Sequence, residues 1–325
     1  MKVQELRELL SASDRACLEK AFVECYKELR KGQKEEADPV ITDILKGMET
    51  SRKKAEAPGD FNALKEQITV FIENAYAQNY FAPNRIIPKS QRPKWRFLVK
   101  NFIKALEKIP PEDSNHSQAV KLLTDLYCLI CEACNYYLFS TDDPFRSIGW
   151  EQPKFFELVV GKTFANGYPR EDISRLLLCA ATGGLSRESL HIMQEIVFLN
   201  GLKTSDVKYI AIEEADKLVK ETIQALQGLG KYDSKQYYLK EKINELCRMI
   251  LILTISLSEP EKGIEYYFKN SWESRREITL YRALDTVRRI GDDSLWIQVY
   301  EYGIKKKIKP RDSLQAAYEA KKNPN

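Results

Sequence analysis

Helical periodicity is the feature of this sequence that most limits what it can fold into. Apolar residues recur at spacings of three and four along nearly the whole chain, and no stretch alternates apolar and polar residues as a β-strand does. Residues that interrupt helices are scarce, since 14 glycines and 13 prolines among 325 residues are about 8% of the chain, where about 12% is usual. We therefore expect an all-α protein.

Three glycine sites in the second half of the chain lie at equal intervals. Asn166-Gly167, Gly183-Gly184 and Asn200-Gly201 are 17 residues apart, and each stands where a left-handed residue would end a helix. Aligning them gives two apolar registers, which comprise Phe156, Ile173, Leu190 and Val207, and Val159, Leu176, Met193 and Ile210. Because helices of this kind bury their apolar faces by stacking, we predict a helical-repeat array. Its regular part should end at Glu213 and Glu214, which replace core residues.

Residues 151–218 resemble the α-helical repeat superfamily of tetratricopeptide and HEAT-like proteins in period and apolar pattern. The Trp, Leu-Gly, Tyr, Ala and Pro signature of the tetratricopeptide repeat is absent, so the resemblance carries over no binding residue. It implies an α-α superhelix that presents a surface to another protein. A second segment, residues 81–97, resembles part of an uncharacterised family of bacterial helical proteins and implies no activity.

A turn-rich stretch separates the two halves of the chain. Residues 140–150, with the sequence STDDPFRSIGW, gather the types that favour turns. We predict a boundary here, between an N-terminal helical bundle of residues 1–143 and a helical-repeat-like part of residues 144–325.

Several features indicate a cytoplasmic protein. Residues 1–13 carry charges where a secretory signal needs an apolar block. The longest apolar run, residues 249–257, is shorter than the ~20 residues that span a bilayer. The seven cysteines lack the spacing of a disulfide framework, which favours reduced thiols in a cytosol. We expect no association with a membrane.

One segment of the first half is strongly basic. No acidic residue occurs between Glu73 and Glu107. Four of its cations repeat every fourth residue on one predicted helix, where neighbouring like charges repel by about 0.2–0.5 kcal/mol per pair. Phe97 lies beside them, off the apolar face, where a base could stack on it. The candidate polyanion-binding residues are Arg85, Lys89, Arg92, Lys94, Arg96, Phe97, Lys100 and Lys104.

The positive charge of this segment can be accommodated in several ways. The cations can form a solvated face, or pack against an acidic helix of the same protein. They can also bind the phosphates of a nucleic acid or another polyanion, or an acidic protein surface. The net charge of +4 and the sequence pI of about 8.5 are lower than those of a typical nucleic-acid-binding domain.

No pattern in the sequence indicates catalysis. Cys128, Cys131 and Cys134 lie three residues apart, but on a helix they fan out and no fourth ligand follows at metal-site spacing. We interpret them as core thiols and regard Cys128, on the polar side, as the one to test for reactivity. We expect His191 at the surface or the edge of its repeat unit. Glu214 either marks the edge of the array or points inward, where burial would raise its pKa.

These observations favour one function and leave an alternative. We expect a non-catalytic scaffold or adaptor of helical-repeat type whose partner is another protein. We expect no catalytic, cofactor-binding or metal-binding residues. The alternative is a protein that binds nucleic acid or another polyanion through residues 85–104.

Overall fold

A computed structural model of the chain describes residues 3–29, 34, 38, 41–42, 45, 60–84, 86–230, 232–290 and 293–323. These residues form 15 α-helices and two short 3₁₀ helices, with no strand among them, so the all-α prediction is confirmed. No helix in these ranges combines the length and the apolar character needed to cross a bilayer. The chain divides into two compact units, Met1–Gly59 and Asp60–Asn325.

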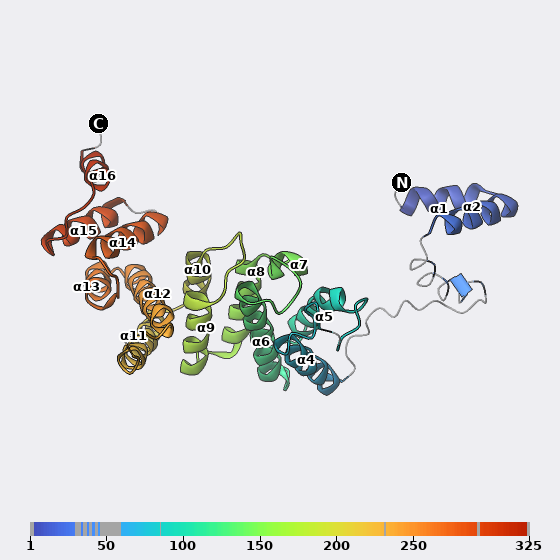
Figure 1. Ribbon diagram of the computed structural model, residues 1–325, viewed down its shortest axis with the longest axis horizontal. Helices are drawn as coiled ribbons and strands as arrows, with labels where there is room; N and C mark the ends of the chain where they lie inside the picture. The colour runs from blue at the N-terminus through green and yellow to red at the C-terminus, as the bar shows by residue number, and fades with distance from the viewer. Residues whose placement is uncertain are drawn as a thin grey trace. The chain divides into compact units, whose positions relative to one another are not determined.

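The first unit contains two consecutive helices, α1 (Val3–Ala12) and α2 (Arg15–Glu28) (Figure 1). Asp14 begins α2 as its N-cap, because its side chain accepts a hydrogen bond from the Cys17 backbone N–H at 2.9 Å. Among the described residues of this unit, no side chain is buried. Leu9 and Phe22 are more than half exposed.

The second unit begins with helices that surround α6. Asp60 caps the first of them, and α6 packs against four of its neighbours, which are α4, α5, α7 and α8. These elements are α4 (Phe61–Tyr76), η1 (Arg92–Lys94), α5 (Trp95–Glu107), α6 (His116–Asn135), α7 (Pro144–Ile148) and α8 (Gln152–Thr163). Aromatic rings fill the space between α4, α5 and the segment after α6, with Trp95 stacked on Phe139 at 3.9 Å between centroids.

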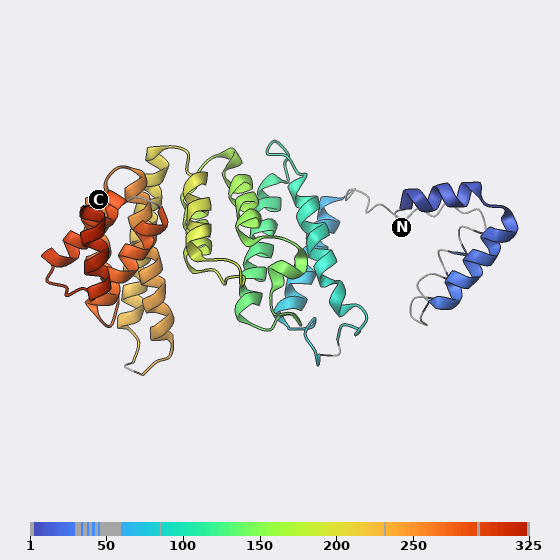
Figure 2. The ribbon, with the colours of Figure 1, turned by 90° about the horizontal axis from the view of Figure 1, so that it is seen from above.

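The later helices follow one another in a row (Figures 1 and 2). They are η2 (Phe164–Asn166), α9 (Arg170–Thr182), α10 (His191–Gly201), α11 (Ser205–Gln227), α12 (Lys235–Ser256), α13 (Pro260–Asn270), α14 (Arg276–Ile290), α15 (Asp293–Lys305) and α16 (Asp312–Lys322). α10 packs on α8 and α9, α9 packs on α11, α11 on α12, and α12 on α13. The buried apolar residues of the second unit therefore extend along the row of helices instead of gathering around one central point.

The predicted division at residues 143/144 differs from the compact units of the structure, since it falls inside the second unit. Here Asp143 is buried and begins α7. Its carboxylate accepts hydrogen bonds from the Arg146 backbone N–H at 3.1 Å and from the Ser186 hydroxyl at 2.7 Å. Phe145 is fully buried, and Gly149 ends α7 in the left-handed conformation. The turn-forming residues of this stretch thus build a short capped helix within a continuous core.

The regular glycines have different roles from those predicted. Gly167 alone of the three sites has a positive φ, of 128°. Gly183 has a φ of −63°, and Gly201 is the last residue of α10. A Cβ on Gly201 would lie 2.4 Å from Val160 Cγ1, and one on Gly184 would lie 2.0 Å from the Cys131 carbonyl oxygen. These later glycines are required for close packing between elements, whereas the prediction assigned them to helix ends of left-handed conformation.

Only some residues of the two predicted apolar registers are buried. Phe156, Ile173 and Val207 are buried, but Leu190 and Met193 are 48% and 42% exposed. The reason is that residues 183–190 form a connection and α10 begins only at His191. The third unit is therefore out of phase with its neighbours. The fourth helix, α11, continues past the 17-residue interval to Gln227, as the absence of a glycine at the next interval predicts.

Candidate functional site

The basic segment lies in a loop, in η1 and along α5. The opposite face of α5 is anchored by Trp95, Val99 and Phe102, which are buried and leave the cations outside the core. Lys89, Lys94, Arg96 and Lys104 are exposed, and Arg92 and Lys100 are half-buried. Phe97 is 55% exposed, as its position in the sequence predicts. Arg85 lies outside the described residues.

None of the described cations of this segment forms an ion pair with a described carboxylate. These cations are Lys89, Arg92, Lys94, Arg96, Lys100 and Lys104. Arg92 donates instead to the Ile87 carbonyl at 2.8 Å. The Arg96 guanidinium lies 5.4 Å from the centroid of the Phe97 ring. Within the described structure the segment is thus a solvated basic face.

Two neighbouring side chains have surroundings that their places in the sequence do not indicate. Leu98 shares the apolar spacing of Trp95 and Phe102, yet it is 39% exposed. Tyr80 precedes the cations in the sequence, but it is 7% exposed and packs in the aromatic core, with its ring centroid 5.2 Å from that of Phe71. Phe97 therefore provides the stacking surface of this segment, with Leu98 as an exposed apolar neighbour.

A second exposed surface lies on α10 and was missed because its residues fit the repeat register. Leu190, Met193 and Ile196 are 48%, 42% and 37% exposed. Leu190 is the extended residue that precedes α10, and Met193 and Ile196 follow on the first two turns of the helix. The other side of α10 is anchored by Phe198, which is fully buried. We call Leu190, Met193 and Ile196 the α10 apolar edge.

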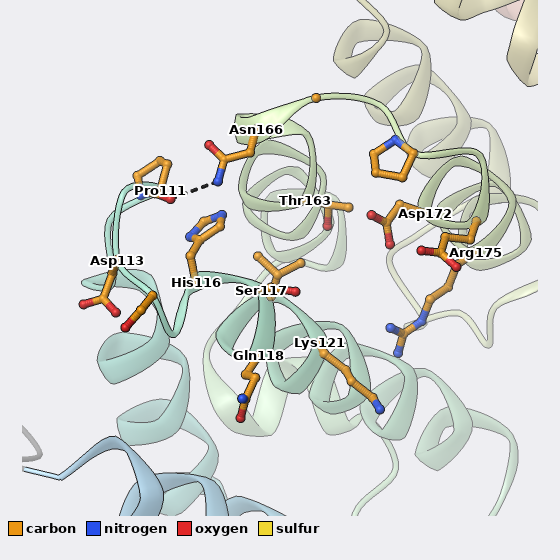
Figure 3. A pocket seen from close by; sticks show the side chains of 15 residues that line it. Pro111, Asp113, His116, Ser117, Gln118, Lys121, Thr163, Asn166, Asp172 and Arg175 are labelled. Atoms are coloured by element: carbon orange, nitrogen blue, oxygen red, sulfur yellow. Dashed lines mark hydrogen bonds between the residues drawn. The ribbon is translucent and has the colours of Figure 1, made fainter.

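Figure 3 shows a hollow of about 670 Å³ between the first turns of α6 and α9. His116 is buried in its wall and its Nε2 lies 3.1 Å from the Lys162 carbonyl oxygen, while Nδ1 has no hydrogen-bond partner in the described structure. Asn166 closes the rim by donating to the Pro111 carbonyl at 2.9 Å. Arg175 is already paired with Asp125 at 2.5 Å. The lining mixes both signs of charge and shows no nucleophile bonded to a base among the described residues.

Glu214 is buried, but its chemistry differs from the predicted alternative of a raised pKa. It accepts hydrogen bonds from Arg170 Nη1 at 2.9 Å and from Ser174 Oγ at 2.8 Å. Burial opposes ionisation, yet these donors hold the pKa of Glu214 below its ordinary value. Glu214 is therefore a carboxylate that ties α11 to α9, which makes it unsuited to be a general acid near neutral pH.

His191 and the charges next to it form a cluster that sequence analysis missed. Instead of lying at the surface, His191 is half-buried, and burial lowers its pKa to about 4. Next to it, fully buried Glu195 of α10 accepts three hydrogen bonds of 2.9–3.1 Å from Arg248 of α12. Glu245 touches the same guanidinium without hydrogen-bond geometry, and burial raises its pKa to about 7. Local spacing accounts only for Glu245 and Arg248, which lie three residues apart on α12, whereas the bonds to Glu195 join helices far apart in the sequence.

The three cysteines of α6 have different surroundings. Cys131 is buried, and Cys134 Sγ donates to the Ile130 carbonyl at 3.4 Å. Cys128 Sγ lies 3.5 Å from Cys179 Sγ on α9, a partner that the sequence pattern does not indicate. Over the described ranges, no three His, Cys, Asp or Glu side chains are arranged to hold a metal ion.

No protein family, curated protein or solved structure matches this chain. Its own residues and their geometry therefore supply the basis for inferring a function.

Proposed function

We propose that this chain is a non-catalytic scaffold that binds another protein, and that the α10 apolar edge is part of the binding surface. The observation that carries the proposal is the exposure of three apolar side chains, Leu190, Met193 and Ile196, around the start of α10. Exposed apolar side chains grouped in this way can pack against the apolar face of a partner helix. Covering such side chains is favourable, since complete burial of one Leu, Ile or Met contributes about 1.5–3 kcal/mol.

Other features of the chain support this proposal. The resemblance of residues 151–218 to helical-repeat proteins favours a surface for an extended protein ligand. The seven free cysteines favour a reducing cytoplasm, and the resemblance of residues 81–97 favours a bacterial one. We therefore propose an adaptor of helical-repeat type in the bacterial cytoplasm.

The test changes the α10 apolar edge without touching the core. Met193→Glu and Ile196→Glu alter exposed side chains, and Tyr209→Glu on α11 is the control because Tyr209, like Met193, is 42% exposed. A photoreactive residue at Leu190 identifies the protein captured in a native lysate, and titration of that purified protein measures its Kd. We expect Met193→Glu and Ile196→Glu to weaken binding at least about tenfold, the equivalent of 1.4 kcal/mol. Equal affinity in these variants and in Tyr209→Glu would contradict the proposal.

A second candidate function is binding of nucleic acid or another polyanion through the basic segment. The observation that favours it is that its described cations have no carboxylate partner and that one of them, Arg96, lies 5.4 Å from the centroid of the exposed Phe97 ring. Each phosphate that such a surface neutralises releases a counterion, so affinity should fall steeply with salt.

The test of this second function uses the side chains that are most exposed. Lys94→Glu, Arg96→Glu and Lys104→Glu are combined in one variant, and Lys305→Glu, Lys307→Glu and Lys309→Glu make the charge-matched control, since these lysines are also exposed. Fluorescence anisotropy with labelled single-stranded RNA is recorded from 50 to 300 mM salt. If the basic segment binds the phosphates, the first variant loses binding and the control keeps it. Absence of binding by the parent at low salt would exclude this function.

A further inference from the structure

Residues at three successive turns of α6 contact α9 or the connection that follows it. Asp125 pairs with Arg175 of α9 at 2.5 Å. Cys128 comes next, with its sulfur atom 3.5 Å from that of Cys179 on α9. The backbone at Gly184, in the connection after α9, packs so closely on Cys131 that a Cβ would lie 2.0 Å from the Cys131 carbonyl oxygen. These contacts hold the two thiols side by side on different helices.

A small reagent can reach this thiol pair. Cys128 and Cys179 both line a hollow of about 300 Å³ on the surface of the second unit, and both are half-buried. Cys131 lies at the bottom of the same hollow but is buried. Cys134 contributes nothing to its lining and is bonded to its own helix.

The surroundings give the two sulfur atoms unequal acidity. The hydrogen bond from Cys179, together with the positive charge of Arg175, lowers the pKa of Cys128, although burial and the carboxylates of Asp125 and Glu132 oppose this shift. The same hydrogen bond and burial raise the pKa of Cys179. Cys128 is therefore the member that ionises first and attacks an oxidant, and Cys179 keeps its proton beside it.

We propose that Cys128 and Cys179 form a dithiol site that a hydroperoxide oxidises to an intramolecular disulfide. The Cys128 thiolate attacks one peroxide oxygen, the O–O bond breaks, and hydroxide leaves as Cys128 becomes a sulfenic acid. The Cys179 sulfur then attacks Cys128 Sγ, the S–O bond breaks, and the Cys179 proton leaves with the hydroxyl group as water. Two thiols are oxidised by two electrons while one hydrogen peroxide is reduced to two waters.

The two sulfur atoms lie close enough for this disulfide to form. Sulfur atoms in a disulfide lie about 2.05 Å apart, so the pair must approach by about 1.5 Å, which is within the range of side-chain rotation. The bond links residues that are 51 positions apart in the sequence and fixes α6 to α9. Oxidation thus links the later turns of the two helices whose first turns line the hollow of Figure 3.

The experiment measures where peroxide acts on the full chain. Exposed Cys17 and Cys25 are replaced by serine so that they do not consume reagent. The folded protein is treated with hydrogen peroxide, free thiols are blocked, and linked peptides are located by tandem mass spectrometry. In this background Cys179→Ser isolates the first step, Cys128→Ser removes the attacking thiol, and Cys134→Ser is the control on the same helix. Circular dichroism checks that each variant remains helical.

We expect a peptide linked through Cys128 and Cys179, with a mass lower by two hydrogen atoms, in the parent and at the same rate in Cys134→Ser. We expect Cys179→Ser to accumulate a sulfenic acid at Cys128 that dimedone traps, at least about tenfold faster than any product at Cys134. Cys128→Ser should give neither product. A linked peptide that includes Cys131 or Cys134, or a folded protein that forms no cross-link, would overturn the proposal.

Discussion

Arg248 shows how single residues in this protein balance buried charge. Its guanidinium binds Glu195 through three hydrogen bonds and also faces Glu245. One cation cannot fully offset the desolvation of two carboxylates, so burial raises the pKa of both Glu195 and Glu245. Glu214 is different because Arg170 and Ser174 both donate to it. The balance between burial and hydrogen bonding therefore decides the direction of the pKa shift, since burial outweighs three hydrogen bonds at Glu195, whereas the donors outweigh burial at Glu214.

The raised pKa of Glu245 gives a prediction for the pH dependence of stability. In the folded chain its pKa is about 7 against an ordinary 4.5, so between these values the native state holds a proton that the unfolded state releases. The free energy of unfolding should therefore fall as the pH rises from 4.5 to 7, by at most about 1.4 kcal/mol per pH unit for one proton.

Urea denaturation of Glu245→Gln at pH 5, 6, 7 and 8 checks this expectation. Glutamine carries no titratable proton, so the decline of the parent over this range should be smaller in the variant. Glu157→Gln, which changes an exposed carboxylate of α8, serves as the control and should follow the parent. Parallel profiles for the parent and Glu245→Gln would contradict the role assigned to Glu245.

At the scale of helices, glycine determines how closely neighbouring elements approach. Gly263 of α13 faces α12, where a Cβ would lie 1.9 Å from Thr254 Oγ1 and 3.2 Å from Leu251 Cα. Thr254 cannot easily move away, because it is buried and its hydroxyl donates within α12. Gly161 of α8 has no atom within 4 Å of such a Cβ. The same residue type thus has a packing role in one helix and none in the other.

Substitution of these two glycines by alanine should have opposite effects. Gly263→Ala should destabilise the chain by about 1–3 kcal/mol, because the added methyl group forces α12 and α13 apart. Gly161→Ala should stabilise it by about 0.5–1 kcal/mol, because alanine favours a helix interior and meets no obstacle. Chemical denaturation of both variants measures the difference, and a change of the same sign in both would count against this account.

For the whole molecule, the packing around α6 decides where the chain can be divided. Tyr127 is fully buried, and its ring contacts Phe155 and Phe156 of α8 with centroids 5.4 and 5.0 Å away. Gln152 of α8 donates to the Tyr127 hydroxyl at 3.4 Å. Aromatic and polar contacts therefore cross the turn-rich residues 140–150, and a chain beginning at residue 144 would lack the partner surface of α8.

Two truncated chains test this organisation. Residues 60–325 contain one continuous core and should unfold cooperatively with the Tm that the full chain shows for this unit. Residues 144–325 expose Phe155 and Phe156 and should lose the cooperative transition or show a clearly lower Tm. Differential scanning calorimetry compares the three chains. An equal Tm for residues 144–325 would instead support the boundary that the sequence predicts at 143/144.

Local signals account for most of what could be predicted. Asp14 and Asp60 belong to the residue types that cap helices, and each of them begins one. The apolar spacing around Val99 coincides with the buried face of α5. The exposure of Phe97 was predicted in the same way. Capping and periodicity depend on residues a few positions apart, so the sequence by itself determined that the chain is helical, where most helices begin, and which segment is basic.

Only the tertiary structure decided which distant residues meet. Cys128 and Cys179 are 51 positions apart, and Arg248 and Glu195 are 53. The exposure of Leu190 and Met193 arose because α10 begins later than its register predicts. Helix periodicity fixes the face on which a residue lies, but not the helix that covers that face. That choice depends on connection lengths and on close approaches such as those at Gly184 and Gly201, which emerge only when the helices pack.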